Sequence, residues 1–225
     1  MKIKAFTLAE VLLTLVIIGV IASITIPTIV NNVGEQERAA KVKKVYSTYG
    51  KAFTFARAFG ADMEFQEVDK SQEAMNAWYN EFMKTRLSTL KVCYDTKGCW
   101  NDGNTYYYNG NVVESNRAGI GIGNQIITAK LADGTMVNMD MWSNQNSIKN
   151  QFGVDPKGSA VMVIYFDING ERKPNKVGKD VFAMLYSANL GLVPAYTGKS
   201  KKDIENNCSP NKTGISCIQK YLKRL

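Results

Sequence analysis

A chain of 225 residues, of which 45% are hydrophobic and 21% are charged, has the length and composition of one ordinary domain with an additional element. Its formal net charge is +8 and it contains no histidine, which excludes the His-based catalytic triads and most zinc sites. We therefore expect no catalytic residues and a protein that is not an enzyme.

The hydrophobic residues are concentrated at the N-terminus. The segment AFTLAEVLLTLVIIGVIASITIP (5–27) carries one acidic residue, Glu10, near its start and one proline, Pro27, at its end. No residue in the range 11–30 is charged, and about twenty helical residues span about 30 Å, the thickness of the hydrocarbon core of a membrane. The segment therefore predicts one membrane-spanning helix.

The helical pattern continues beyond the apolar segment. Apolar residues recur at intervals of three and four positions, which predicts an amphipathic continuation of the same helix; they are Val42, Val45, Tyr46, Tyr49, Ala52, Phe53 and Ala56. Gly60 is a suitable C-terminal cap. We predict one helix from about residue 8 to about residue 59, roughly 75–80 Å long. This continuation argues against a cleaved secretory signal peptide.

The N-terminal sequence KAFTLAEVLLTLVIIGVIASITIP resembles that of type IV pilins and type II secretion pseudopilins. The shared elements are a short basic leader, Phe6, Thr7 and Leu8, Glu10 five residues into the mature chain, an apolar run with Gly19, and Pro27. The resemblance implies cleavage by a prepilin peptidase between Ala5 and Phe6, and N-methylation of Phe6. Such families usually have glycine before the cleavage site, where this chain has Ala5.

The resemblance also implies an architecture and a location. Residues 1–5 are expected to be a leader peptide, residues 6–34 a transmembrane and polymerisation helix, and residues 35–225 a soluble pilin-like head that includes the amphipathic half of the helix. The chain is expected to be a single-pass protein of a bacterial inner membrane, with a periplasmic or extracellular head, that is assembled into a filament. The expected partners are other pilin or pseudopilin subunits, the prepilin peptidase, an inner-membrane assembly platform and membrane lipid.

Two functions are consistent with this resemblance. The first is a structural subunit of a type IV pilus-like filament or of a type II secretion pseudopilus. The alternative is a minor tip subunit, or a subunit for DNA uptake or adhesion, with a basic C-terminal tail. Residues 199–225 carry seven Lys or Arg and two acidic residues. Such a tail could bind nucleic acid, an anionic surface polymer or a neighbouring subunit, although most charged runs are simply solvated.

Glu10, Gly19 and Pro27 are the residues that we expect to act in assembly. A carboxylate alone in lipid is unfavourable. In the family geometry, Glu10 of one subunit can face the Phe6 amine of a neighbour, which would fix the register between subunits. In a lone subunit Glu10 would instead reach the membrane surface. Pro27 removes a backbone donor and, with Gly19, would let the helix bend or unwind when subunits pack; a tolerated kink is the alternative.

The remaining sequence predicts an α+β head. A helix is expected over 71–87 (SQEAMNAWYNEFMKTRL). Strand signals follow in TYYYNGNVVE, with an Asn-Gly turn at 109–110, in QIITAKLADGTMVNMDMW, with an Asp-Gly turn at 133–134, and in AVMVIYFDINGERKPNKVGKDVFAMLY, with two strands around a polar loop. We expect an antiparallel sheet of four or five strands packed on the amphipathic half of the long helix. The segment GIGIGN (119–124) lacks the third glycine of a dinucleotide-binding loop and predicts a turn.

The four cysteines form two local pairs, with five and eight intervening residues. Four cysteines allow three connectivities, and a head outside the cytoplasm would lie in an oxidising compartment. We predict the disulfides Cys93–Cys99 and Cys208–Cys217, because each bond closes a short loop over turn-rich sequence.

The polar loop DINGERKPNKVGKD (167–180) allows two interpretations. Its oxygen-bearing side chains could bind calcium; they are Asp167, Asn169, Glu171 and Asp180. The EF-hand pattern is absent, because no glycine stands at the sixth position and no glutamate at the twelfth. We favour a structured loop, fixed by Asp and Asn side-chain turns and by Pro174 and Gly178, since a similar segment occurs in the heads of many prepilin-like proteins. No other cofactor is expected.

Overall fold

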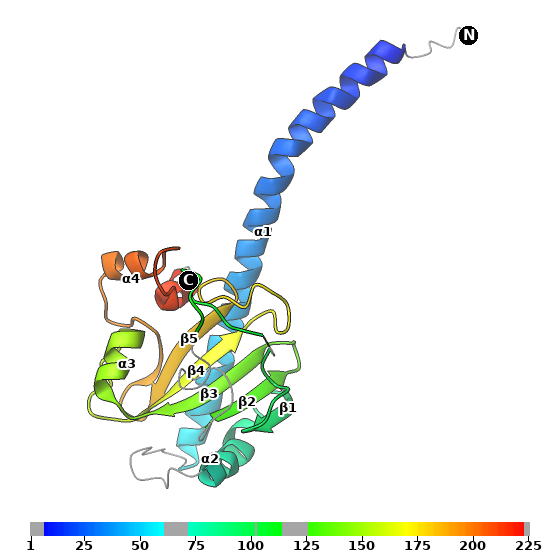
Figure 1. Ribbon diagram of the computed structural model, residues 1–225. Coiled ribbons are helices and arrows are strands. Elements are labelled where there is room, and N and C mark those ends of the chain that lie inside the picture. The colour runs from blue at the N-terminus through cyan, green and yellow to red at the C-terminus, as the bar shows by residue number, and fades with distance from the viewer. Residues whose placement is uncertain (1–6, 61–71, 102, 114–125, 223–225) are drawn as a thin grey trace. The chain divides into compact units, whose positions relative to one another are not determined.

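The computed structural model describes residues 7–60, 72–101, 103–113 and 126–222. The chain consists of two compact units, Met1–Ala40 and Lys41–Leu225. One helix, α1 (Leu8–Ala58), contributes residues to both units, so the single long helix predicted from the sequence is confirmed (Figure 1). Gly60 follows it with a φ of +76°, the left-handed conformation with which helices commonly end.

The second unit is built on one antiparallel sheet of six strands. These are β1 (Thr89–Tyr94), β2 (Ile126–Leu131), β3 (Met136–Trp142), β4 (Val161–Asp167), β5 (Val181–Ser187) and β6 (Gly191–Pro194). Each strand pairs with its neighbour in the sequence, in the order β1-β2-β3-β4-β5-β6 (Figure 1). The predicted α+β class is confirmed, with a larger sheet than the expected four or five strands.

The strands that the sequence did not predict are the two edge strands. β1 has exposed residues and a register irregularity between Thr89 and Lys91, and β6 has only four residues, all half-buried. Neither has the clear apolar pattern of an interior strand. The strands predicted on either side of the Asn-Gly turn at 109–110 are not part of this sheet. Their described residues form isolated bridges instead, between Tyr106 and Val112 and between Tyr106 and Lys176.

The helix predicted over 71–87 is present from Gln72 to Met83. Residue 71 lies outside the described residues, and residues 84–87 form turns rather than helix. It consists of α2 (Gln72–Trp78) and a π-helical turn, η1 (Tyr79–Met83). Trp78, Tyr79 and Met83 are buried. The Tyr79 hydroxyl lies 2.9 Å from Oγ1 of Thr89, which ties this helix to the start of β1.

Residues 41–58 of α1 cover one face of the sheet (Figure 1). Phe53 stacks on Tyr186 of β5, with ring centroids 3.8 Å apart. The Tyr46 hydroxyl donates a hydrogen bond of 2.8 Å to the carbonyl oxygen of Leu192 in β6. The apolar stripe predicted from the sequence is the packed face, because all of its residues except the half-buried Tyr46 are buried.

Helix α3 (Gln145–Phe152) packs on the opposite face. Phe152 meets the rings of Trp142 and Tyr165 edge-on, at centroid distances of 5.3 and 5.9 Å. Because both faces are covered, every residue of β4 and β5 is buried. This explains why their sequences are continuous apolar runs rather than alternating ones.

The C-terminal segment adds α4 (Lys201–Asn207), a 3₁₀ turn η2 (Ile215–Cys217) and α5 (Ile218–Leu222). Tyr221 packs edge-on against Phe182 of β5, with ring centroids 5.3 Å apart. The α5 part of the basic tail predicted over 199–225 therefore packs on the sheet, whereas all residues of α4 except Ile204 are exposed or half-buried.

Candidate functional site

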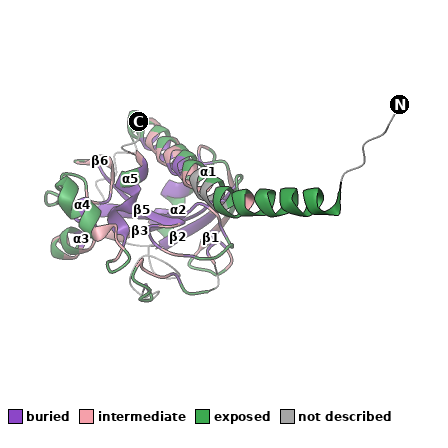
Figure 2. Cartoon of the chain, turned by 90° about the horizontal axis from the view of Figure 1, so that it is seen from above, coloured by how far each residue is buried: buried purple, intermediate pink, exposed green. Residues whose placement is uncertain are grey.

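The first unit presents an apolar helix that the described chain does not cover. Leu8–Ile26 is long and apolar enough to cross a membrane, and none of it is buried. Its large aliphatic side chains are 44–78% exposed, as Figure 2 shows for this end of α1. A soluble monomer rarely exposes so large an apolar surface. The segment is therefore suited to lipid or to packing against other proteins.

Polar side chains in this segment are satisfied within the helix. Three hydroxyl groups donate to backbone carbonyl oxygens one turn earlier, Thr14 to Val11 at 2.9 Å, Ser23 to Val20 at 2.7 Å and Thr25 to Ile21 at 2.9 Å. A hydroxyl paired in this way carries little cost in an apolar environment. Glu10 is the one charged residue between positions 7 and 34, which makes it the chemically distinctive group of the segment.

Glu10 closes the N-terminus of α1 together with Thr7. The Thr7 hydroxyl accepts a hydrogen bond of 3.2 Å from the Glu10 N–H. The Glu10 carboxylate accepts bonds of 2.9 Å from both the N–H and the hydroxyl of Thr7. This reciprocal arrangement is a capping box, which satisfies backbone donors that the helix itself cannot pair. The family resemblance does not imply a capping role for Thr7. The T-x-x-E spacing at 7–10 is the sequence signal of a capping box.

The other residues expected to act in assembly show no special geometry in the lone chain. α1 is helical through Gly19 and Pro27, and a Cβ placed on Gly19 would meet no atom within 4 Å. The unwinding expected on subunit packing thus stays a prediction. Ala5 and Phe6, the residues of the expected cleavage site, lie outside the described residues, as does the GIGIGN segment.

The β4–β5 loop brings together three of the four candidate calcium ligands. The Asp180 carboxylate accepts hydrogen bonds from the Asn169 side-chain amide at 3.0 Å and from the backbone N–H groups of Asn175 and Lys176 at 2.9 and 2.6 Å. The Asp167 carboxylate accepts the N–H groups of Asn169 and of the following glycine, at 3.0 and 2.9 Å. Both carboxylates therefore hold the loop backbone.

The fourth candidate ligand, Glu171, lies apart from the other three. Its carboxylate pairs with the Lys130 ammonium, and its side chain is 72% exposed. In the described part of the chain, no three His, Cys, Asp or Glu side chains lie close enough together to hold a metal ion. The calcium set as proposed from the sequence is not assembled, and the hydrogen bonds to Asp167 and Asp180 support the structured-loop interpretation.

The pKa values of both buried loop carboxyl groups are raised. Burial, and then the negative charge of Asp180, raise the pKa of Asp167 to about 8. The pKa of Asp180 is also raised by burial, which hydrogen bonds from the loop backbone oppose. Burial and the neighbouring negative charge therefore both favour the protonated form of Asp167.

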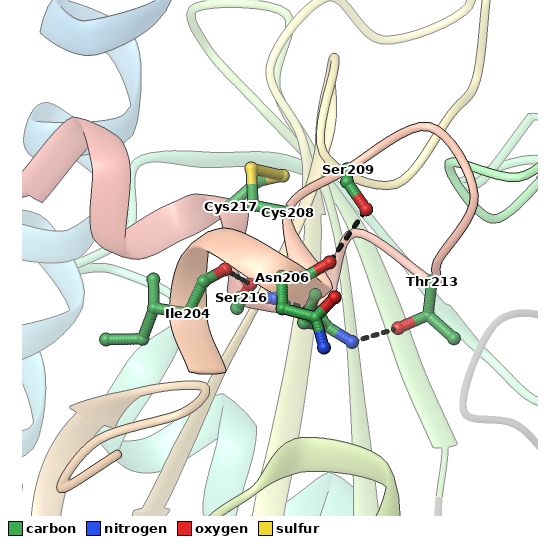
Figure 3. The surroundings of a disulfide bond; sticks show 8 residues. Ile204, Asn206, Cys208, Ser209, Thr213, Ser216 and Cys217 are labelled. Atoms are coloured by element: carbon green, nitrogen blue, oxygen red, sulfur yellow. Dashed lines mark hydrogen bonds between the residues drawn. A yellow bond between two sulfur atoms is a disulfide. The ribbon is translucent and has the colours of Figure 1, made fainter. Parts of the chain in front are cut away.

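Both predicted disulfides are present. The S–S distances are 2.06 Å in Cys93–Cys99 and 1.99 Å in Cys208–Cys217. The second bond joins the end of α4 to η2 (Figure 3). Beside it, the Ser216 hydroxyl donates a hydrogen bond of 2.7 Å to the carbonyl oxygen of Ile204. The C-terminal segment is thus tied together by a covalent bond and by buried hydrogen bonds.

A further buried carboxyl group, which no sequence pattern predicted, lies in β3. Asp140 is 8% exposed, and its Oδ2 accepts a hydrogen bond of 2.7 Å from the Trp142 indole N–H. Burial raises the pKa of Asp140 to about 7, although the bonds from Trp142 and from the Met141 backbone oppose this shift.

Because of Asp140, the free energy of unfolding should decrease as the pH rises. Between the unfolded pKa of about 3.9 and the folded pKa of about 7, the folded protein binds more protons than the unfolded chain, so the free energy of unfolding falls as pH rises. In Asp140→Asn, which keeps an acceptor for Trp142, this loss should be smaller by roughly 2–4 kcal/mol. Denaturant unfolding of the full chain in detergent at pH 5 and pH 8.5, followed by circular dichroism, measures it. Equal pH dependence in the two proteins would contradict the prediction.

Comparison with known proteins does not assign the chain to a family. No family model matches the chain, and neither a curated protein nor a solved structure matches it.

Proposed function

We propose that this chain is a structural subunit of a type IV pilus-like filament or of a type II secretion pseudopilus, processed by a prepilin peptidase and assembled through its N-terminal helix. The observation that carries the proposal is the exposed apolar helix Leu8–Ile26 with a single carboxylate, Glu10, held at its N-terminus. A segment that served only as an anchor would gain no more than a helix cap from this residue, whereas its charge disfavours transfer into lipid.

The capping box supports this proposal because it gives Glu10 a stable place in a waiting subunit. Before assembly, the carboxylate is held by Thr7 at 2.9 Å. In a filament, the Phe6 amine of a neighbouring subunit would approach the same carboxylate as a charged partner. Each subunit would then carry its register-setting group in a prepared position.

The head is consistent with a location outside the cytoplasm. Its two disulfides close short loops in two separate parts of the head sequence, and such bonds persist mainly in oxidising compartments. An antiparallel sheet against the second half of α1 is also compatible with a pilin-like head.

The test of the proposal is the N-terminus of the native protein. Lys2 and Lys4 should hold the leader in the cytoplasm by the positive-inside rule, so a peptidase on that side should cut after Ala5. We expect intact mass and N-terminal sequencing of the membrane fraction to show a chain that begins at methylated Phe6. Ala5→Gly should be cut at least as well, whereas Ala5→Leu should accumulate as precursor. A native chain that still begins at Met1 would overturn the proposal.

A further inference from the structure

Three loops that lie far apart in the sequence meet at one place on the head. They are residues 106–110, 171–179 and 209–213, and together we call them the three-loop surface. The N–H of Tyr106 donates to the carbonyl oxygen of Asn175 at 2.9 Å, and the carbonyl oxygen of Tyr106 accepts the N–H of Val177 at 2.8 Å. The N–H groups of Tyr108 and Asn109 donate to the carbonyl oxygens of Thr213 and Lys212, at 3.0 and 2.9 Å. Backbone bonds therefore join the first loop to both others.

The junction of the loops is tight. A Cβ on Gly214, whose φ is +77°, would lie 2.6 Å from the Tyr108 Cβ and 2.9 Å from the Val177 carbonyl oxygen. A Cβ on Gly178 would lie 2.8 Å from Sγ of Cys217, so the disulfide packs directly beneath the loops. The surface is thus a fixed platform rather than three independent loops.

The platform is strongly positive. The three loops contain five basic residues, all exposed or half-buried: Arg172, Lys173, Lys176, Lys179 and Lys212. Within the described chain none of the five forms a salt bridge. The acidic residue of these loops, Glu171, is paired with Lys130. The Lys179 ammonium lies 5.1 Å from the centre of the Tyr108 ring, which places a cation on the first loop as well.

The composition of the three-loop surface indicates the kind of partner. Protein interfaces have an apolar or aromatic centre. The tyrosines of the first loop, 106–108, are half-buried, and none of the strongly exposed large hydrophobic side chains of the described chain belongs to the three loops. Phosphate groups are instead bound by Lys and Arg together with Asn and Ser side chains and backbone N–H groups. We propose that the three-loop surface binds the phosphate backbone of double-stranded DNA without regard to sequence.

The test is the salt dependence of DNA binding by the full chain in neutral detergent. The triple variant Lys173→Gln, Lys176→Gln and Lys212→Gln removes three charges from exposed or half-buried side chains and should fold normally by circular dichroism. Fluorescence anisotropy with a labelled random-sequence duplex, between about 50 and 200 mM salt, gives the slope of log affinity against log salt. Each lost phosphate contact should reduce this slope by about 0.9, so we expect a reduction of about 2–3 and an affinity at least tenfold weaker.

A matched variant distinguishes the effect of the three-loop surface on DNA binding from the effect of net charge. Lys51, Lys84 and Lys97 are exposed lysines elsewhere on the head, and replacing all three by glutamine changes the net charge equally. This control should keep most of the slope and affinity. Equal weakening in both triple variants, or no binding at 50 mM salt, would overturn the proposal. So would binding of the unmodified chain to anionic phosphatidylglycerol vesicles or heparin without binding to DNA. Filament incorporation should be normal in both variants, so a failure here leaves the proposed function intact.

Discussion

Replacing Glu10 with valine should leave the subunit processed and resident in the membrane but unable to join filaments. The change removes a charge from an apolar stretch, so membrane insertion should be at least as good as before. The lost cap costs about 1 kcal/mol of helix stability. An unpaired Phe6 amine buried in the filament would cost about 3–5 kcal/mol at each subunit contact. The second effect is larger and repeats along the filament, so assembly should fail. Crosslinking or electron microscopy with co-expressed assembly machinery measures it.

Two further variants distinguish the two proposed roles of Glu10, as a helix cap and as a charged partner of the Phe6 amine. Glu10→Gln removes the charge but keeps an oxygen that can accept the Thr7 donors, whereas Thr7→Val removes the hydroxyl contact and keeps the charge. If the charge sets the register, Glu10→Gln should fail to assemble as Glu10→Val does, and Thr7→Val should assemble with reduced efficiency. Normal filaments made only of Glu10→Gln subunits would show that Glu10 acts as a helix cap and that its charge does not set the register between subunits.

The largest effect on folding should come from Gly214→Ala. The new methyl group must displace the Tyr108 Cβ and the Val177 carbonyl oxygen, at 2.6 and 2.9 Å, and neither atom is the free end of a flexible side chain. Strain from the positive φ adds about 1 kcal/mol or more, and overpacking adds typically 1–3 kcal/mol. We expect a total loss of about 2–4 kcal/mol in the free energy of unfolding of the full chain in detergent, measured with denaturant by circular dichroism.

Gly198→Ala is the matched control for this substitution. Gly198 has nearly the same conformation, with a φ of +81°, but a Cβ there would meet no atom within 4 Å. This variant should show only the conformational term, about 1–2 kcal/mol. The difference between the two variants is then the packing term at the loop junction. Equal losses of stability would show that the junction has room for a methyl group.

The parts of the fold that the sequence predicts are those with periodic or local signals. α1 follows from its apolar run and stripe, β2 and β3 from alternation around Asp133-Gly134, and β4 and β5 from continuous apolar runs. The disulfides are local as well, because each joins cysteines fewer than ten residues apart. β1 and β6 escape prediction because an edge strand needs less apolar sequence than a strand buried on both faces.

Parts of the candidate sites depend on contacts that no single segment encodes. The side chains of Asp167, Asn169 and Asp180 do gather in one loop, as their spacing suggests, but Glu171 pairs with Lys130 from β2, which removes it from the set. The meeting of Tyr106 with Asn175 and of Tyr108 with Thr213 joins segments whose own sequences carry no pairing signal. By contrast, the Thr7–Glu10 capping box can be predicted from the T-x-x-E spacing of the sequence alone.

The strand order of the head has a consequence for the export that the proposed function requires. Because each strand pairs with the one before it, the sheet of an exported chain could grow one strand at a time as that chain emerges from a membrane translocation channel. The contact between the Tyr46 hydroxyl and Leu192, which are 146 positions apart, is made only after β6 has emerged. The Cys208–Cys217 bond is closer still to the C-terminus and can be oxidised only at the end. In the proposed topology the leader stays in the cytoplasm, so the N-terminal helix would be the first segment available to lipid, and the covalent closure of the head would mark the completion of export.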